Sequence, residues 1–259
     1  MDKPLKYAVF GAGSWATAIV KMLSENLDEI GWYMRSVYTK EHLLKEQHNP
    51  NYLSSVEFNL EQLKLSNDIN EIADYADVLI FVIPSAFMHS ELEKLNIDIS
   101  NKVIVSAVKG IMPETGLLVG EHFHKTYKIP FDSIAVIAGP CHAEEVALER
   151  LSYLTISCSD TEKAKTIADT LSSNYIKTKT SDDVIGVEYA VMLKNIYAIA
   201  AGIAHGLGYG DNFQSVLMSN AIREMKRFIK KRHKMKRNIN NSAYLGDLLV
   251  TGYSVFSDR

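Results

Sequence analysis

The chain has 259 residues, of which 47% are hydrophobic and 23% are charged, and its formal net charge is -3. This balance is typical of a globular protein with a proper core, and it excludes a largely disordered or fibrous chain. It also argues against nucleic acid as a partner, because binding a phosphate backbone needs an excess of cations on one face. The segment 226–237 is locally basic, and we interpret it as a solvated helix end, with an anionic partner as the alternative.

The cysteines and the N-terminal region indicate the compartment. Cys141 and Cys158 lack the companions of a disulfide framework or a zinc site, so we expect reduced thiols and no metal. The apolar run that begins at Tyr7 is too short for a signal peptide. No run reaches the roughly 18 consecutive apolar residues of a membrane span. The sequence therefore predicts a cytoplasmic protein without an integral membrane segment.

Short apolar runs alternate with helix-like stretches in the first part of the chain. The runs are nearly continuous in apolar residues, as buried parallel strands are, which predicts a doubly wound α/β fold. They cover residues 7–10, 78–83, 103–107, 134–138 and 154–158, and two long helical stretches follow at 182–207 and 211–233. We therefore expect an N-terminal Rossmann domain over residues 1–180 and a smaller, all-helical substrate domain over residues 181–259.

The first expected strand leads into a glycine-rich turn that opens a helix. The turn, residues 11–16, reads GAGSWA, and its glycines allow close approach of the backbone to a pyrophosphate. The strand, turn and helix context predicts a site for NAD or NADP. Where an NAD site usually places Asp or Glu, this chain has Arg35 and Ser36. These residues suit a 2′-phosphate, and an exposed Arg35 without this role is the alternative.

The helical stretch from Val184 to Ala204 is apolar on nearly every face, so its helix should be buried inside its domain. It nevertheless carries Glu188, Lys194 and Asn195. A lysine on such a helix loses hydration, which is costly unless the ammonium is paired or lies in a cleft. Lys194 is therefore a candidate functional residue, with a structural ion pair as the alternative.

Six blocks in order resemble the bacterial NAD(P)-dependent glycerol-3-phosphate dehydrogenase family, and they cover nearly the whole chain. They are GAGSWATA at 11–18, VIPS at 82–85, SAVKG at 106–110, AGPCHAEEV at 138–146, EYAVMLKN at 188–195 followed by GYGDN at 208–212, and GDLLVT at 246–251. The resemblance implies reversible hydride transfer between NAD(P)H and C2 of dihydroxyacetone phosphate. The product, sn-glycerol 3-phosphate, would supply glycerophospholipid synthesis. The resemblance also allows a homodimer, which no sequence feature demonstrates.

The resemblance further implies roles for single residues. Lys194 matches the general acid/base, which would protonate the alkoxide formed at C2, and Lys109 and Asp247 are the other catalytic candidates. Burial and Lys109 favour a neutral Lys194 amine, whereas Asp247 favours the ammonium, and the sequence leaves open which effect is larger. Residues that match the substrate pocket are Lys109, Gly139, Cys141, Lys194, Asn195, Asp247, Thr251, Ser257 and Arg259. Residues that match cofactor contacts are Gly11, Gly13, Ser14, Trp15, Arg35, Lys109 and Ala143.

Two departures from the family pattern lie near the C-terminus. Where the family usually has Ser-Arg-Asn, this chain has Ser257-Asp258-Arg259, so the phosphate-binding arginine is either Arg259 or missing. The family also continues with further helices, so the substrate domain is expected to be shortened. Two alternatives follow: a nucleotide-binding module without catalysis, or a related 3-hydroxy acid dehydrogenase that shares the Rossmann half and a lysine-bearing helix.

Overall fold

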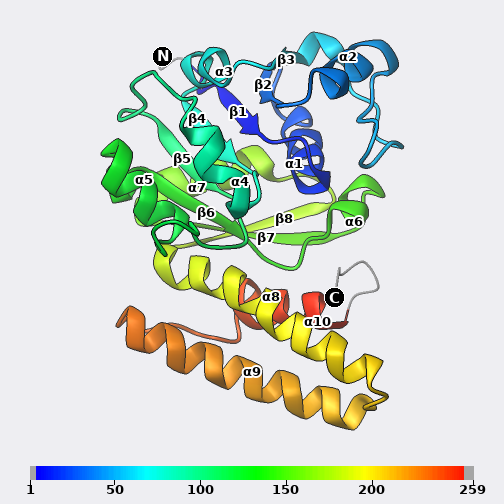
Figure 1. The fold of residues 1–259 in the computed structure, drawn as a ribbon, viewed down its shortest axis with the longest axis vertical. Helices are drawn as coiled ribbons and strands as arrows, with labels where there is room; N and C mark the ends of the chain where they lie inside the picture. Colours follow the sequence, from blue (N-terminus) through cyan, green and yellow to red (C-terminus); the bar gives the residue numbers. More distant parts are fainter. Residues whose placement is uncertain (1–3, 254–259) are drawn as a thin grey trace.

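The computed structural model describes residues 4–253, and one eight-stranded sheet forms its centre (Figure 1). The strand order is β3-β2-β1-β4-β5-β6-β7-β8. The strands are β1 (Tyr7–Phe10), β2 (Ile30–Tyr33), β3 (Leu63–Ser66), β4 (Val78–Phe81), β5 (Val103–Ser106), β6 (Ile134–Ala138), β7 (Ser152–Cys158) and β8 (Ile176–Ser181). All neighbours from β3 to β6 are parallel. This arrangement confirms the doubly wound fold, whose strand order reverses between β1 and β4.

Helices cover both faces of the sheet, and a helical layer lies below it (Figure 1). The helices are α1 (Ser14–Ser24), α2 (Val37–Glu46), α3 (Ile69–Tyr75), α4 (Ser85–Leu92), α5 (Val119–Tyr127), α6 (Ala143–Ala147), α7 (Thr161–Leu171), α8 (Val184–Gly206), α9 (Asp211–Arg232) and α10 (Asp247–Tyr253). Short turns are η1 (Leu60–Gln62), η2 (Phe131–Ser133) and η3 (Ser242–Gly246), the last of which has π-helical hydrogen bonds.

The direction of β7 corrects one expectation. The run at 154–158 is expected to be a parallel strand, but β7 runs antiparallel to β6, and β8 then runs parallel to β7. A parallel return needs a crossover that passes over the sheet. The connection after β6 contains only the five-residue helix α6, which packs against α1. The chain therefore turns back beside β6 instead of crossing over the sheet.

Three strands, β2, β3 and β8, are not among those expected from the sequence. β3 and β8 are the two edges of the sheet, and each carries lysine where a buried strand would have apolar residues: Lys64 in β3, Lys177 and Lys179 in β8. Edge strands commonly carry lysine, which discourages pairing with other chains. Because of these lysines, a search for continuous apolar runs does not detect β3 and β8.

Two hydrophobic clusters, one on each face of the sheet, form the core. Alternation along β1 shows the division: Ala8 and Phe10 belong to one cluster, and Tyr7 and Val9 belong to the other. The first cluster includes buried residues of α3, α4, α5, α8 and α9, and the second includes buried residues of α1, α6 and α7. The helical layer therefore shares its core with one face of the sheet.

The helices α8 and α9 confirm the two expected helical stretches, and they form an antiparallel hairpin. The Gln214 side chain of α9 is buried and donates to the Ala201 carbonyl of α8 at 2.9 Å. By length and composition α8 is apolar enough to cross a membrane, but 61% of its most apolar window is buried inside the fold. This burial is typical of a core helix.

A buried ion pair fixes the start of α8. The Asp183 carboxylate caps the helix by accepting from Gly186 N at 3.0 Å, and it accepts from the Tyr244 hydroxyl at 2.5 Å. Arg237 donates to the same carboxylate through Nε at 2.6 Å, and its side chain is 5% exposed. Arg237 belongs to the basic segment 226–237, so this member of the segment is structural and not part of a solvated helix end.

Replacing Arg237 by Ala is expected to destabilise the protein by about 3–5 kcal/mol, because the change leaves the Asp183 charge buried without its cation. Burial raises the pKa of Asp183, but hydrogen bonds from Arg237 and Tyr244 outweigh it and hold the pKa below its usual value. The stabilisation is therefore present above the unfolded pKa and is lost as the pH falls. Urea unfolding of Arg237→Ala beside the exposed Lys236→Ala measures the difference; equal losses would contradict this interpretation.

Candidate active site

The glycine-rich turn lies where β1 ends and α1 begins. Gly11 has φ +128°, and a Cβ at this position would lie 2.9 Å from the Val82 carbonyl oxygen, so the turn requires glycine here. Gly13 caps α1, whose first turn presents backbone N–H groups without helical partners. Such a helix start suits a pyrophosphate.

A groove of about 550 Å³ runs from this turn to the end of β2, and we call it the nucleotide groove. Its lining residues are Gly11, Ala12, Gly13, Ser14, Trp15, Ala16, Tyr33, Arg35, Ser36, Thr39, Asn51, Tyr52, Val82, Ile83, Pro84, Phe87 and Glu91. The groove lies at the carboxyl ends of β1, β2 and β4, where the strand order reverses and doubly wound folds bind dinucleotides. Its shape, its glycine turn and its helix start therefore fit a nicotinamide dinucleotide.

Asn49 supports the groove, although no sequence pattern indicates it. The side chain is fully buried, and its Nδ2 donates to the Ala12 carbonyl at 3.0 Å and to Thr17 Oγ1 at 2.9 Å. Its Oδ1 accepts from the backbone of Asn51 and Tyr52, which line the groove. Asn49 thus ties the glycine turn to the opposite wall of the groove.

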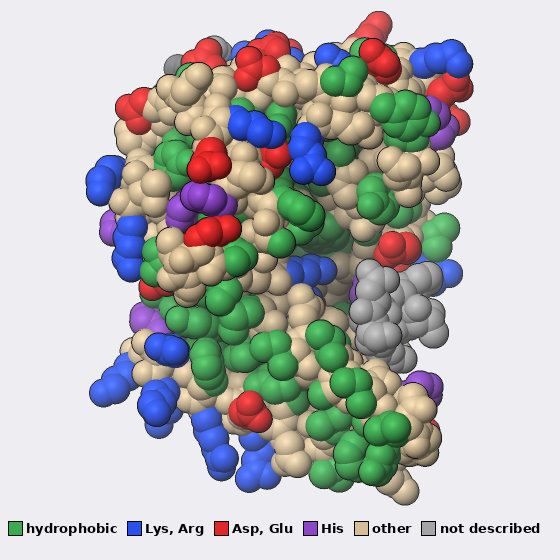
Figure 2. All heavy atoms as spheres, in the orientation of Figure 1, with side chains coloured by type: hydrophobic (Ala, Val, Ile, Leu, Met, Phe, Trp, Pro, Cys, Tyr) green, Lys and Arg blue, Asp and Glu red, His purple; other side chains and the backbone are tan. Residues whose placement is uncertain are grey.

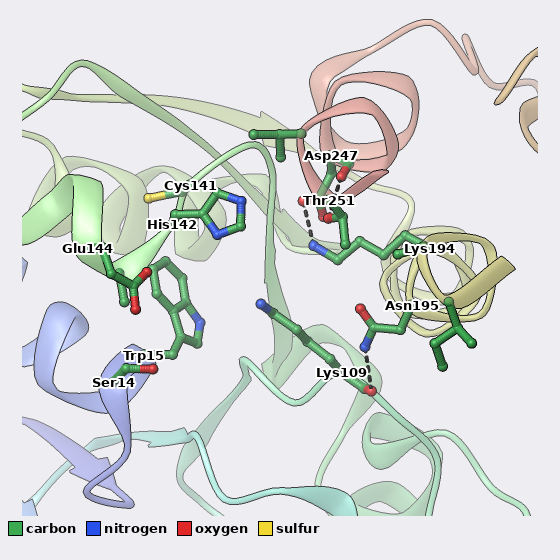
Figure 3. A pocket seen from close by; sticks show the side chains of 14 residues that line it. Ser14, Trp15, Lys109, Cys141, His142, Glu144, Lys194, Asn195, Asp247 and Thr251 are labelled. Carbon is green, nitrogen blue, oxygen red and sulfur yellow. Dashed lines mark hydrogen bonds and ion pairs between the residues drawn. The ribbon is translucent and has the colours of Figure 1, made fainter. Parts of the chain in front are cut away.

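A second pocket of about 390 Å³ lies between the sheet and the helical layer, and we call it the central pocket (Figure 3). Its lining residues are Ser14, Trp15, Lys109, Cys141, His142, Ala143, Glu144, Lys194, Asn195, Ala198, Ile199, Asp247, Val250 and Thr251. Ser14 and Trp15 line both cavities, so the pocket opens beside the start of α1. Gly139 lines a smaller recess that shares Lys109, Lys194 and Asp247 with the pocket.

Lys194 lies on α8 and points into the central pocket (Figure 3). Its side chain is 6% exposed, and Nζ donates to Asp247 Oδ1 at 2.5 Å. Asp247 begins α10 and is 3% exposed, and its Oδ2 has no hydrogen-bond partner among the described residues. Lys194 is thus paired and also lies at the pocket wall, so the ion pair does not exclude a functional role.

Lys109 approaches the same pocket from the loop after β5 (Figure 3). Its Nζ lies 5.8 Å from the centroid of the Trp15 ring. Lys109 is exposed as a whole residue, and its ammonium is the part that lies among protein atoms at the pocket. This desolvation, with the nearby Lys194 charge, lowers the pKa of Lys109 to about 8. Lys109 is therefore mostly a cation at neutral pH and loses its charge under mildly alkaline conditions.

Asn195, Thr251 and Cys141 add neutral polar groups to the pocket. Asn195 Nδ2 donates to the Lys109 carbonyl at 3.5 Å, and Thr251 Oγ1 donates to the Asp247 carbonyl at 2.7 Å. Burial raises the pKa of the Cys141 thiol to about 12, so this cysteine is a small neutral group and not a nucleophile. Among the described lining residues, Lys109 is the lysine without a carboxylate at salt-bridge distance, which suits an anionic ligand.

The structure gathers most of the expected site residues into these two adjoining cavities. Gly11, Gly13 and Arg35 line the nucleotide groove, and Ala143 lines the central pocket with the lysines. Ser257 and Arg259 lie outside the described residues. Asn49 and Glu91 are site residues that sequence reasoning misses. No group of three metal-ligating side chains occurs within residues 4–253.

Two family models match the chain. The N-terminal model of NAD-dependent glycerol-3-phosphate dehydrogenase matches residues 6–164, and the C-terminal model matches residues 183–258. The chain belongs to this family. Its members include relatives named glycerol-3-phosphate dehydrogenase (NAD(P)+). The one from Macrococcus caseolyticus is 32% identical over 98% of this chain and 76% of its own length. The one from Lysinibacillus sphaericus is 34% identical over 97% of this chain and 75% of its own length.

Solved glycerol-3-phosphate dehydrogenases have the same fold. The structure from Coxiella burnetii matches with a TM-score of 0.88 and 26% identity, over 98% of this chain and 77% of that chain. The structure from Plasmodium falciparum matches with a TM-score of 0.87 and 25% identity, over 97% of this chain and 73% of that chain. This chain therefore spans about three quarters of the length of these dehydrogenases.

Proposed function

We propose that this chain is an NAD(P)-dependent glycerol-3-phosphate dehydrogenase that reduces dihydroxyacetone phosphate reversibly to sn-glycerol 3-phosphate for glycerophospholipid synthesis. The observation that carries the proposal is the position of Lys194, held by Asp247 in a pocket that adjoins the nucleotide groove. Family membership supports the same reaction.

The proton chemistry is proposed for Lys194. The bound nicotinamide supplies the hydride that C2 receives during reduction. The C2 oxygen then gains negative charge, and the Lys194 ammonium donates the proton that it needs. Asp247 holds the ammonium in place. In the reverse direction Lys194 accepts the proton of the C2 hydroxyl.

Binding of the substrate phosphate is proposed for Lys109, Asn195 and Thr251, which line the pocket around Lys194. Lys109 offers a charge, and the other two offer neutral donors. Ser257 and Arg259 stay proposals as phosphate contacts. We also propose that Gly11, Gly13, Ser14, Trp15, Arg35 and Ala143 contact the cofactor. We further propose that the domain boundary lies near residue 180, at the end of β8, which is followed by α8.

A comparison of substrates tests this function. NADPH oxidation should depend on dihydroxyacetone phosphate and saturate with it, because Lys109 recognises the phosphate. Turnover should be far slower with an unphosphorylated 3-keto acid at the same concentration. Turnover of the 3-keto acid alone would favour the related 3-hydroxy acid dehydrogenase, and cofactor binding without turnover of either would favour the non-catalytic module.

The protonation of Lys109 predicts a pH dependence of substrate binding. Its pKa is lowered to about 8, so the cation is present below that pH and is lost above it. The KM for dihydroxyacetone phosphate should therefore rise as the pH increases through about 8, and Lys109→Met should raise KM roughly tenfold at neutral pH and flatten the rise. Steady-state kinetics across this range measure both effects. A rise that persists in Lys109→Met would assign it to another group.

We also propose a homodimer, formed through an apolar patch on the helical layer. Ile196, Ile199 and Ile203 are spaced to share one face of α8, and Leu207 follows directly after the helix. These four side chains are 54–72% exposed, and Figure 2 shows hydrophobic side chains gathered over this layer. The patch continues through Tyr209, just before α9, and through Phe213 and Val216 in its first turns. With on the order of 100 Å² exposed by each side chain, the patch approaches the ~800 Å² that each partner contributes to a standard interface.

The mass in solution tests this patch. Multi-angle light scattering should give a dimer for the unmodified chain, and Ile203→Glu should give a monomer, because a buried charge without a partner opposes association. Leu148→Glu is the matched control, since Leu148 is 57% exposed outside the patch. A monomeric unmodified chain, or a dimer that withstands Ile203→Glu, would contradict the proposal.

A cytoplasmic location without nucleic-acid partners is proposed as well. Cys141 and Cys158 are free thiols, which suits a reducing compartment. The net charge of -3 provides no general attraction for a phosphate backbone.

A further inference from the structure

The nucleotide groove contains a carboxylate that its sequence motif does not predict. Glu91 of α4 is 3% exposed and lines the groove together with Tyr33, Arg35 and Phe87. In NAD-preferring sites an Asp or Glu usually follows the second strand and accepts from the ribose 2′-hydroxyl. This chain has none after β2, where Arg35 and Ser36 stand. α4 therefore brings an acid to the wall of the groove where β2 provides none.

The contacts of Glu91 keep its charge in place. The Tyr33 hydroxyl donates to Oε2 at 2.5 Å, and Lys94 Nζ donates to Oε1 at 2.7 Å. Burial raises the pKa of Glu91, but these hydrogen bonds from Lys94 and Tyr33 outweigh it and hold the pKa below its usual value. Glu91 is therefore ionised at neutral pH, and the folded chain fixes its position.

Arg35 lies on the groove side of this carboxylate. Arg35 Nη1 is 3.8 Å from Glu91 Oε1, and the guanidinium lies 5.6 Å from the centroid of the Phe87 ring. The Arg35 side chain is 65% exposed, so it is open to a ligand, whereas Glu91 is covered. A phosphate that binds Arg35 must therefore come close to a fixed negative charge.

We propose that Glu91 is a specificity-determining residue, whose carboxylate weakens binding of the 2′-phosphate of NADP(H) and keeps NAD(H) competitive in a groove that contains Arg35. The 2′-phosphate brings additional negative charge, whereas the 2′-hydroxyl of NAD(H) brings none, so Glu91 acts on the two cofactors unequally. This proposal rests on one part of the proposed function, namely that the groove binds a nicotinamide dinucleotide.

A purely structural role for Glu91 predicts the opposite sign. If the carboxylate served mainly to position Arg35, its loss would release the guanidinium and weaken NADPH binding. If the carboxylate repels the 2′-phosphate, its loss strengthens NADPH binding. The direction of the change therefore separates the two roles.

The test is Glu91→Gln, which keeps the shape and an acceptor for Tyr33 while removing the charge. Dissociation constants for NADPH and NADH are measured by titration of nicotinamide fluorescence at low salt, without turnover. NADPH should bind roughly three- to tenfold more tightly, and the NADH constant should change less than about twofold. Glu93→Gln is the control, because Glu93 is 66% exposed and does not line the groove. This control should change neither constant.

Weaker NADPH binding by Glu91→Gln, or equal shifts for both cofactors, would overturn the proposal. If this variant fails to fold, Glu91→Met removes the same charge with a similar volume and has the same expected result. In an Arg35→Met background, Glu91→Gln should still favour NADPH, because the carboxylate acts on the phosphate itself. Loss of the effect there would mean that Glu91 acts only through Arg35. Failure of both cofactors to bind the unmodified chain would instead contradict the proposed function, and this assignment with it.

Discussion

Lys194→Ala is expected to lower kcat for dihydroxyacetone phosphate reduction by roughly 10²–10⁴-fold, the usual loss when a positioned proton donor is removed. The Lys194 ammonium donates to Asp247 at 2.5 Å and lies in the central pocket. Ser14 and Trp15 line both this pocket and the nucleotide groove. NADPH binding should change little, because Lys194 does not line that groove. Steady-state rates and nicotinamide fluorescence measure the two properties separately.

Lys177→Ala is the control for this substitution, since Lys177 is an exposed lysine on the edge strand β8. It should leave kcat unchanged. If Lys194→Ala kept the kcat of the unmodified chain, another group would have to donate the proton. Equal loss of turnover and NADPH binding would indicate general damage to the fold.

Asp247→Asn is expected to lower the rate of reduction by roughly 10²-fold, because the carboxylate that holds the proton donor in the pocket is lost. The amide oxygen can still accept a hydrogen bond from Lys194, but it cannot balance the charge of the buried ammonium. NADPH binding should change little, because Asp247 does not line the nucleotide groove. Steady-state rates and nicotinamide fluorescence measure the two properties.

Asp247→Asn is also expected to destabilise the protein by about 3–5 kcal/mol, because it leaves Lys194 buried without its carboxylate. Urea unfolding provides this value. A loss of stability without any loss of kcat would show that Asp247 has only a structural role.

The sequence predicts the parts of the site that depend on local patterns. The glycine turn follows from the strand and helix around it, and the apolar helix with one lysine marks Lys194 as unusual. Lys194 and its partner Asp247 are 53 residues apart in the chain, and no sequence pattern links them. The two residues are expected in one site only because the blocks around both resemble one family. The structure then explains the pairing, since α10 packs against α8.

The features that sequence reasoning misses depend on packing between distant elements. Glu91 lies in an ordinary helical stretch, 58 residues after Tyr33 in the chain. Its contact with Tyr33 depends on how α4 packs against the sheet. Asn49 likewise reaches the glycine turn across 37 residues. The antiparallel direction of β7 follows from the short connection containing α6. No hydrophobic periodicity and no sequence motif indicates these contacts or the direction of β7.

A single-turnover measurement shows whether NADPH bound to this chain reduces dihydroxyacetone phosphate. The unmodified chain is loaded with NADPH and mixed with dihydroxyacetone phosphate, and nicotinamide absorbance and fluorescence are followed together. The proposed site predicts a rapid loss of absorbance equal to one NADPH per chain, and a stable NADPH complex without this loss in Lys194→Ala. An unmodified chain that binds NADPH but never transfers its hydride to dihydroxyacetone phosphate would contradict the proposed function.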